Sequence, residues 1–73
     1  MIESEAVAKS ISDLMVDCSA RLNASTAYVR DNCTAEEFKI YRRAVGKVMG
    51  EILLEIMNPL YEKHPSLKPS ELI

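Results

Sequence analysis

Apolar side chains recur every three or four residues through the first part of the chain, a spacing typical of one face of an amphipathic helix. The recurring positions are Val7, Ile11, Leu14, Cys18, Leu22 and Val29. They fall within a sector of about 80° around the helix axis. This narrow apolar seam predicts a helix whose back is exposed to water, with Val16 as the one sizeable apolar residue on that back.

The ends of this first helix are also indicated by the sequence. Ser4 has the residue type of an N-cap, and Asn32 is a residue type that tolerates the left-handed conformation that often closes a helix. We therefore expect the helix over about residues 4–30 and a turn over 31–33.

A second helix has sharper boundaries. Thr34, followed three residues later by Glu37, has the spacing of a capping box. At the other end, Pro59 disfavours helical backbone at Asn58, the residue before it. The second helix is therefore predicted over about residues 35–57.

The two helices have matched lengths of roughly 35 to 40 Å. Because a connection of only a few residues separates them, we expect an antiparallel two-helix hairpin. Residues 59–73 contain prolines and lack periodicity, so they are expected to form a short helix or an irregular tail. The whole chain, 1–73, is predicted to be one all-α domain.

The apolar face of the second helix is too wide for a simple hairpin. It spans an arc of about 140°, almost twice that of the first helix. The arc contains Phe38, Tyr41, Val45, Val48, Met49, Ile52, Leu53, Ile56 and Leu60. An apolar face left uncovered in this way usually marks an association site, and the economical partner is a second copy, giving a four-helix bundle.

Two other arrangements would also cover the wide arc. In a monomer, the C-terminal segment would fold back as a lid. The lid residues would be Leu60, Tyr61, Leu67 and Leu72. Alternatively, a different protein would cover the arc in an obligate hetero-assembly.

The expected interface combines this arc with two neighbouring glycines. It comprises Tyr41, Val45, Gly46, Val48, Met49, Gly50, Ile52, Leu53 and Ile56. Glycine destabilises a helix by about 0.5 to 1 kcal/mol relative to alanine, so Gly46 and Gly50, four residues apart, favour a close helix crossing. The crossing can be within the chain or between two copies, and the spacing can also arise by chance.

Charge and length narrow the classes of partner. The 73-residue chain has a formal net charge of −2 with acidic and basic residues interspersed, so nucleic acid is not expected to be the main partner. The alternative function is binding of nucleic acid or another anionic partner by a basic strip on the second helix. This strip is formed by Lys39, Arg42, Arg43 and Lys47. A solvated helix back is the preferred interpretation of the strip.

No motif for catalysis, cofactor binding or metal binding stands out. His64 is the single histidine, and one imidazole without a second ligand at helical spacing does not indicate a metal site. Cys18 and Cys33 are separated by most of a helix, so no disulfide between them is expected. No apolar run approaches the length of a membrane span, and we expect a cytoplasmic protein.

These observations predict a non-catalytic interaction or structural module that self-associates through the apolar face of its second helix. We expect a homodimer, with another protein as a possible alternative partner. No enzyme activity, cofactor or membrane insertion is expected.

Overall fold

A computed structural model describes residues 1–69, and throughout this part of the chain the regular structure is helical, with no strand. The predicted all-α class is therefore confirmed. The elements are α1 (Glu5–Asn32), α2 (Ala35–Glu51), the π-helical segment η1 (Ile52–Met57), α3 (Asn58–Lys63) and the 3₁₀ turn η2 (Pro65–Leu67).

Helix α1 starts at the predicted N-cap, but its C-terminal end is not closed by the predicted left-handed residue. The Ser4 hydroxyl accepts a hydrogen bond from the Val7 N–H at 3.2 Å, which confirms the N-cap. The helix extends to Asn32, two residues beyond the predicted end. The expected left-handed residue is absent within residues 1–69. Instead, the Asn32 side-chain amide donates to the Tyr28 carbonyl at 2.8 Å and satisfies one of the last carbonyls of the helix.

Helix α2 begins with the predicted capping box. The Glu37 N–H donates to Thr34 Oγ1 at 3.1 Å, and the Thr34 N–H donates to Glu37 Oε1 at 2.9 Å. The hydrogen bond from the Thr34 N–H, together with one from its hydroxyl, lowers the pKa of the Glu37 carboxyl below its usual value.

The predicted effect of Pro59 on the backbone of Asn58 is wrong. Asn58 has right-handed helical angles, φ −61° and ψ −49°, and its N–H donates to the Leu53 carbonyl, five residues back. Proline lacks an N–H, and in a regular α-helix its ring clashes with the carbonyl four residues earlier. The wider π-helical turn of η1 accommodates this clash, so the helical backbone continues through η1 into α3 instead of stopping at Met57.

The π-helical turn also changes which residues face inward. In an unbroken α-helix, Met57 and Tyr61 would point about 120° and 160° away from Val45. All three side chains are nevertheless buried. Because η1 takes up about one extra residue, it rotates the following residues back by about 100°, which brings both side chains within about 60° of Val45.

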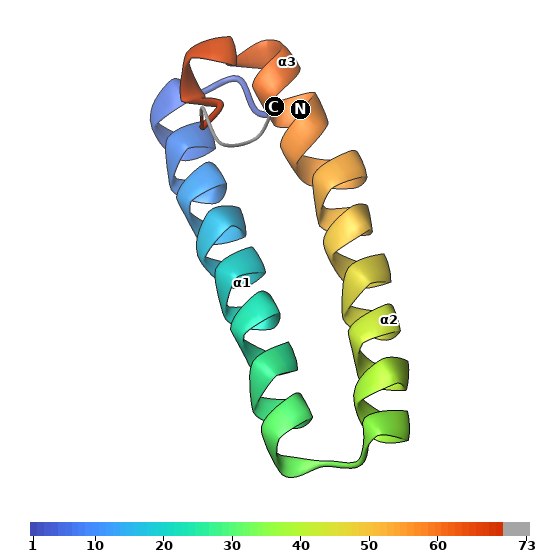
Figure 1. Cartoon of the computed structure of the whole chain (residues 1–73). Coiled ribbons are helices and arrows are strands. Elements are labelled where there is room, and N and C mark those ends of the chain that lie inside the picture. Colours follow the sequence, from blue (N-terminus) through green and yellow to red (C-terminus); the bar gives the residue numbers. More distant parts are fainter. Residues whose placement is uncertain (70–73) are drawn as a thin grey trace.

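The two long helices lie side by side and run in opposite directions (Figure 1). The chain reverses at Cys33 and Thr34, between α1 and α2. At the other end, η1, α3 and η2 bring the chain back over the start of α1 (Figure 1). The resulting rod measures 45 × 19 × 16 Å between Cα atoms.

A small core lies at the end where the N-terminal residues meet α3 and η2, which we call the closed end. Its buried apolar residues are Ala8, Met57, Leu60 and Tyr61, and the side chains packed on them are Ile2, Ile11, Met15, Ile52 and Leu67. The C-terminal segment therefore contributes Leu60, Tyr61 and Leu67 to a core shared with α1. Leu72, the fourth residue of the expected lid, lies outside the described residues.

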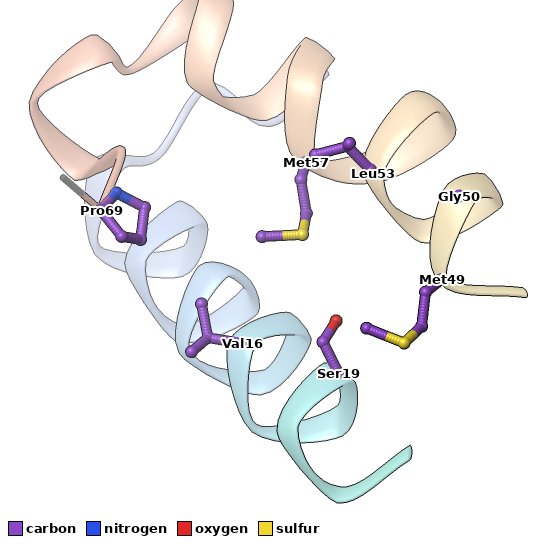
Figure 2. Close-up of a pocket in the computed structure, with 7 residues that line it drawn as sticks. All are labelled: Val16, Ser19, Met49, Gly50, Leu53, Met57 and Pro69. Atoms are coloured by element: carbon purple, nitrogen blue, oxygen red, sulfur yellow. The ribbon is translucent and has the colours of Figure 1, made fainter. Parts of the chain in front are cut away.

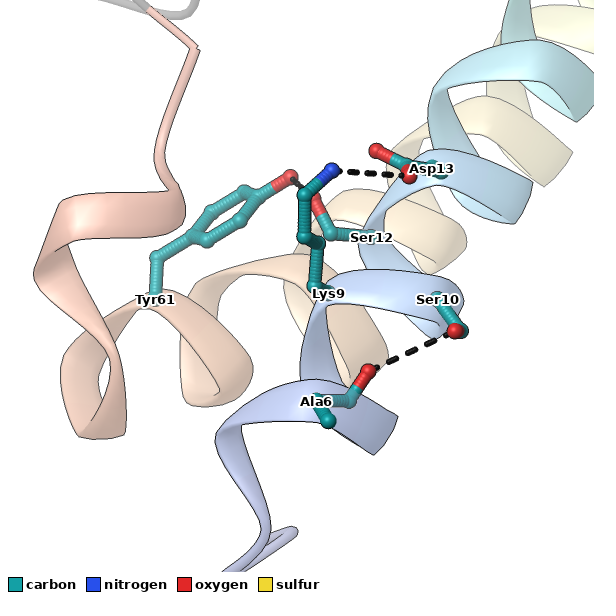
Figure 3. A network of polar contacts seen from close by, with 6 residues as sticks. All are labelled: Ala6, Lys9, Ser10, Ser12, Asp13 and Tyr61. Carbon is teal, nitrogen blue, oxygen red and sulfur yellow. Dashed lines mark hydrogen bonds and ion pairs between the residues drawn. The ribbon is translucent and has the colours of Figure 1, made fainter.

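Polar contacts at the closed end also connect residues 61–64 with the N-terminal residues and the start of α1. The Tyr61 hydroxyl lies 2.6 Å from the Ser12 hydroxyl in a buried hydrogen bond (Figure 3). His64 Nε2 is 2.6 Å from the Ile2 carbonyl oxygen. Lys63 forms an ion pair with Glu3, and this hydrogen bond and the lysine charge lower the pKa of the Glu3 carboxyl.

Candidate functional site

An apolar groove of about 620 Å³ runs between α1 and α2 on one side of the rod. It is lined by Val16, Ser19, Met49, Gly50, Leu53, Met57 and Pro69. Val16 and Ser19 form the α1 wall, and Met49 and Met57 extend toward them from α2 and η1 (Figure 2). Ser19 is the one polar side chain among the lining residues that the structure describes, so their contribution to the groove is mainly apolar contact.

The predicted seam of α1 does not face α2 as a unit. Val7 and Leu14 are about half-exposed, whereas Ala8 and Ser12, which lie to one side of the seam, are buried. The seam residues do not face the core, because α3 packs onto a neighbouring side of α1 at the closed end. There the small side chains of Ala8 and Ser12 let Leu60 and Tyr61 approach. The rod therefore keeps exposed apolar residues outside its own core.

Exposed apolar side chains occur on two opposite sides of the rod. Val16 lines the groove and is 42% exposed. Leu14 precedes it by two residues, which places the two side chains about 160° apart around α1. Val7, seven residues before Leu14, shares the side of Leu14. We call this second side the opposite face.

The structure divides the nine predicted interface residues between several locations. Met49, Gly50 and Leu53 line the groove. Val45 is buried within the single chain, and Tyr41 is half-buried with its hydroxyl 2.8 Å from the Ser25 hydroxyl. The remaining four are Gly46 and Val48, which are exposed, and Ile52 and Ile56, which are half-buried.

Neither glycine marks a helix crossing within the chain. A Cβ atom built on Gly46 or Gly50 would meet no heavy atom within 4 Å beyond its immediate helical surroundings. The intramolecular version of the predicted crossing is therefore wrong. A crossing between two copies stays a prediction, and the space above Gly50 is part of the groove.

Val16, Ser19 and Pro69 line the groove but were not among the residues predicted for the site. A signal was present for Val16, because it was the one large apolar residue on the expected wet side of α1. Ser19 continues a row of small or flexible residues at helical spacing, formed by Ala8, Ser12, Met15 and Ser19. Pro69 carries no such signal, because its position depends on the path of the chain after α3.

The basic strip lies on the exposed surface of α2. Lys39, Arg42 and Arg43 surround a shallow hollow of about 470 Å³ together with the half-buried Phe38. Lys47 is also exposed. None of the four basic side chains forms an ion pair with another residue in the described part of the chain.

Other chemistry is sparse in residues 1–69. Both cysteines are free thiols, with Cys18 half-buried and Cys33 exposed. Over the same residues, no three of the histidines, cysteines and carboxylates are grouped closely enough to hold a metal ion. No helix there has the length and apolar character of a membrane span.

No protein-family model matches the chain, and no curated protein or solved structure matches it either.

Proposed function

We propose that this chain is a non-catalytic interaction module, an antiparallel two-helix hairpin that self-associates into a four-helix bundle. The observation that carries the proposal is the accessible surface. The chain exposes 5419 Å², whereas a compact monomer of 8.2 kDa exposes about 4,500 Å². The excess of about 900 Å² is close to the roughly 800 Å² that each partner buries in a protein–protein interface of standard size.

The shape of the rod supports the same proposal. Its radius of gyration is 14.5 Å, compared with about 11 Å for a compact domain of this length. The long helices form a single layer, so each helix has one neighbour along most of its length (Figure 1). A second layer would cover a face of 45 × 19 Å, about 860 Å² in projection.

The apolar character of the surface favours a protein partner over an ionic one. Exposed large apolar residues occur on both long helices, including Val16, Val48, Leu53 and Leu54. Clusters of such residues mark association sites in soluble proteins. The −2 net charge gives no comparable support to the basic strip as the main binding site.

Sedimentation equilibrium of the unmodified chain tests the proposal. Over about 1 to 100 μM, the expected result is a reversible increase in mass from 8.2 kDa to twice that value. The thermal unfolding midpoint should also rise with protein concentration, because association stabilises the folded state. A constant monomer mass with a concentration-independent midpoint would contradict self-association.

A further inference from the structure

We infer that the groove is the contact surface of the dimer, and that a second copy docks on it about a two-fold axis passing close to Gly50. This inference rests on the proposed self-association and adds which face is used and how the copies are arranged. The opposite face, which contains Val7 and Leu14, would then remain outside the dimer contact.

The position of the groove along the rod is the first argument. If the two-fold axis is perpendicular to the rods, the two copies run antiparallel, and they overlap along their full length only if the axis passes through their midpoints. The continuous helical stretch from α2 to α3 covers residues 35–63, with its midpoint at Met49, and α1 has its midpoint between Cys18 and Ser19. Met49, Gly50 and Ser19 all line the groove, so the groove begins at the centre of the rod, and Met57 and Pro69 extend it toward the closed end.

The shape of the groove is the second argument. Val16 and Leu53, at its rims, are 42% and 38% exposed, and the space above Gly50 is open. Under two-fold symmetry each copy presents the same rim and the same hollow. The rim side chains of one copy can therefore fill the groove of the other, which covers both sets of apolar residues at once.

Charge at the centre is the third argument. A residue close to a two-fold axis contacts the same residue of the second copy. A charged residue at that position would therefore lie beside a like charge. Among residues 1–69, no lining residue of the groove is charged. On the opposite face, the row Val7, Leu14 continues at the same seven-residue spacing to the exposed Arg21, which lies near the middle of α1. A central two-fold axis on that face would bring the two Arg21 side chains toward each other.

The decisive experiment compares Gly50→Glu with Ala44→Glu. Glutamate at position 50 has room in the single chain and replaces a poor helix former, so the monomer should remain folded, as circular dichroism will show. It would place two like charges at the proposed axis, and we expect the dimer dissociation constant to rise roughly 100-fold. Ala44 is exposed and does not line the groove, so Ala44→Glu should change the constant by less than about threefold.

A cross-linking measurement provides an independent readout. In a Cys18→Ser/Cys33→Ser background, Gly50→Cys should form an intermolecular disulfide under mild oxidation, because a disulfide requires Cα atoms about 4.4 to 6.8 Å apart. Ala44→Cys in the same background should not form this disulfide.

The outcomes separate this inference from the proposed function. A monomeric unmodified chain contradicts the proposed function itself. A dimer that resists Gly50→Glu and is disrupted by Ala44→Glu overturns the groove assignment alone. Nuclear Overhauser contacts within one chain between Met49 and Leu72 or Ile73 would assign the groove to the chain's own C-terminal residues and also overturn it.

Discussion

The two ends of the rod differ in how many sides of α1 and α2 the chain itself covers. At the closed end, α3, η2 and the residues before α1 add a third layer of side chains, and Leu60 is fully buried. At the turn end, around Cys33 and Thr34, only the two helices are present, and Tyr28 and Ile40 are 72% and 67% exposed. Two helices in one layer cover one stripe each, so an enclosed core forms only where a third element is added.

The two ends of the rod are therefore stabilised by different contacts. The closed end has buried apolar contacts and a buried hydrogen bond within one chain. The turn end relies on the Thr34 capping box, on Val45 as its one buried apolar residue, and on the half-buried Ser25–Tyr41 contact. Side chains of the closed end should therefore contribute more to the free energy of unfolding than similar side chains near the turn.

The largest expected effect separates the two ends directly. Leu60→Ala should lower the free energy of unfolding by about 3 kcal/mol, because it leaves a cavity at a fully buried position. Ile40→Ala, near the turn, is the matched control and should change it by less than about 0.5 kcal/mol. Urea unfolding followed by circular dichroism, at one fixed protein concentration, measures both. Equal losses in the two variants would abolish the distinction between the ends.

A smaller effect compares the two tyrosine–serine contacts. Tyr61→Phe should lower the free energy of unfolding by about 1 to 2 kcal/mol, because it leaves the buried Ser12 hydroxyl without its partner. Tyr41→Phe should lower it by less than about 0.5 kcal/mol, because the half-buried Ser25 hydroxyl still donates to the Leu22 carbonyl at 2.6 Å.

The same urea unfolding experiment measures both tyrosine variants. A Ser12→Ala/Tyr61→Phe double variant should recover part of the loss, since no unpaired hydroxyl remains. A larger decrease in the free energy of unfolding for Tyr41→Phe than for Tyr61→Phe would contradict the conclusion that the closed end contributes more to stability.

The smallest effect is a pH dependence with one contributing carboxylate at each end. The pKa values of Glu3 and Glu37 are lower in the folded chain than their usual value of 4.5. Their ionised forms therefore favour folding above that value, and this contribution is lost as the pH falls through the folded pKa. The urea midpoint should decrease between about pH 5 and pH 3, and both Glu3→Gln and Glu37→Gln should make this decrease shallower. An unchanged slope in either variant would remove that carboxylate from the explanation.

Local rules predicted the helical class and the starts of both helices. Ser4, Thr34 and Glu37 act on backbone groups within three residues of themselves, and such short-range chemistry can be read from the sequence. The three-to-four-residue spacing of the apolar positions likewise indicated an all-α chain, because this spacing is a property of each helix by itself.

Features that depend on residues far apart were not predictable in this way. The Ser12–Tyr61 hydrogen bond joins positions 49 residues apart, and its existence depends on how η1 rotates α3. The predicted apolar arc of the second helix also assumed 3.6 residues per turn throughout, so it did not include Met57 or Tyr61, and both are buried. Val16 lines the groove because the buried side of α1 contains Ala8 and Ser12 and does not coincide with the predicted apolar seam.

The π-helical turn before Pro59 has a consequence for the tolerated length of this chain. Because η1 takes up about one surplus residue, it is the place in the second long helix where a deletion is least disruptive. Removing Glu55, an exposed residue of η1, together with replacement of Pro59, would restore an ordinary α-helix and keep Val45 and Tyr61 on the same side. Deleting one residue from α2 instead would rotate all following residues by about 100° relative to the preceding ones. The residues before the deletion and those of the closed end would then no longer keep their relative orientation.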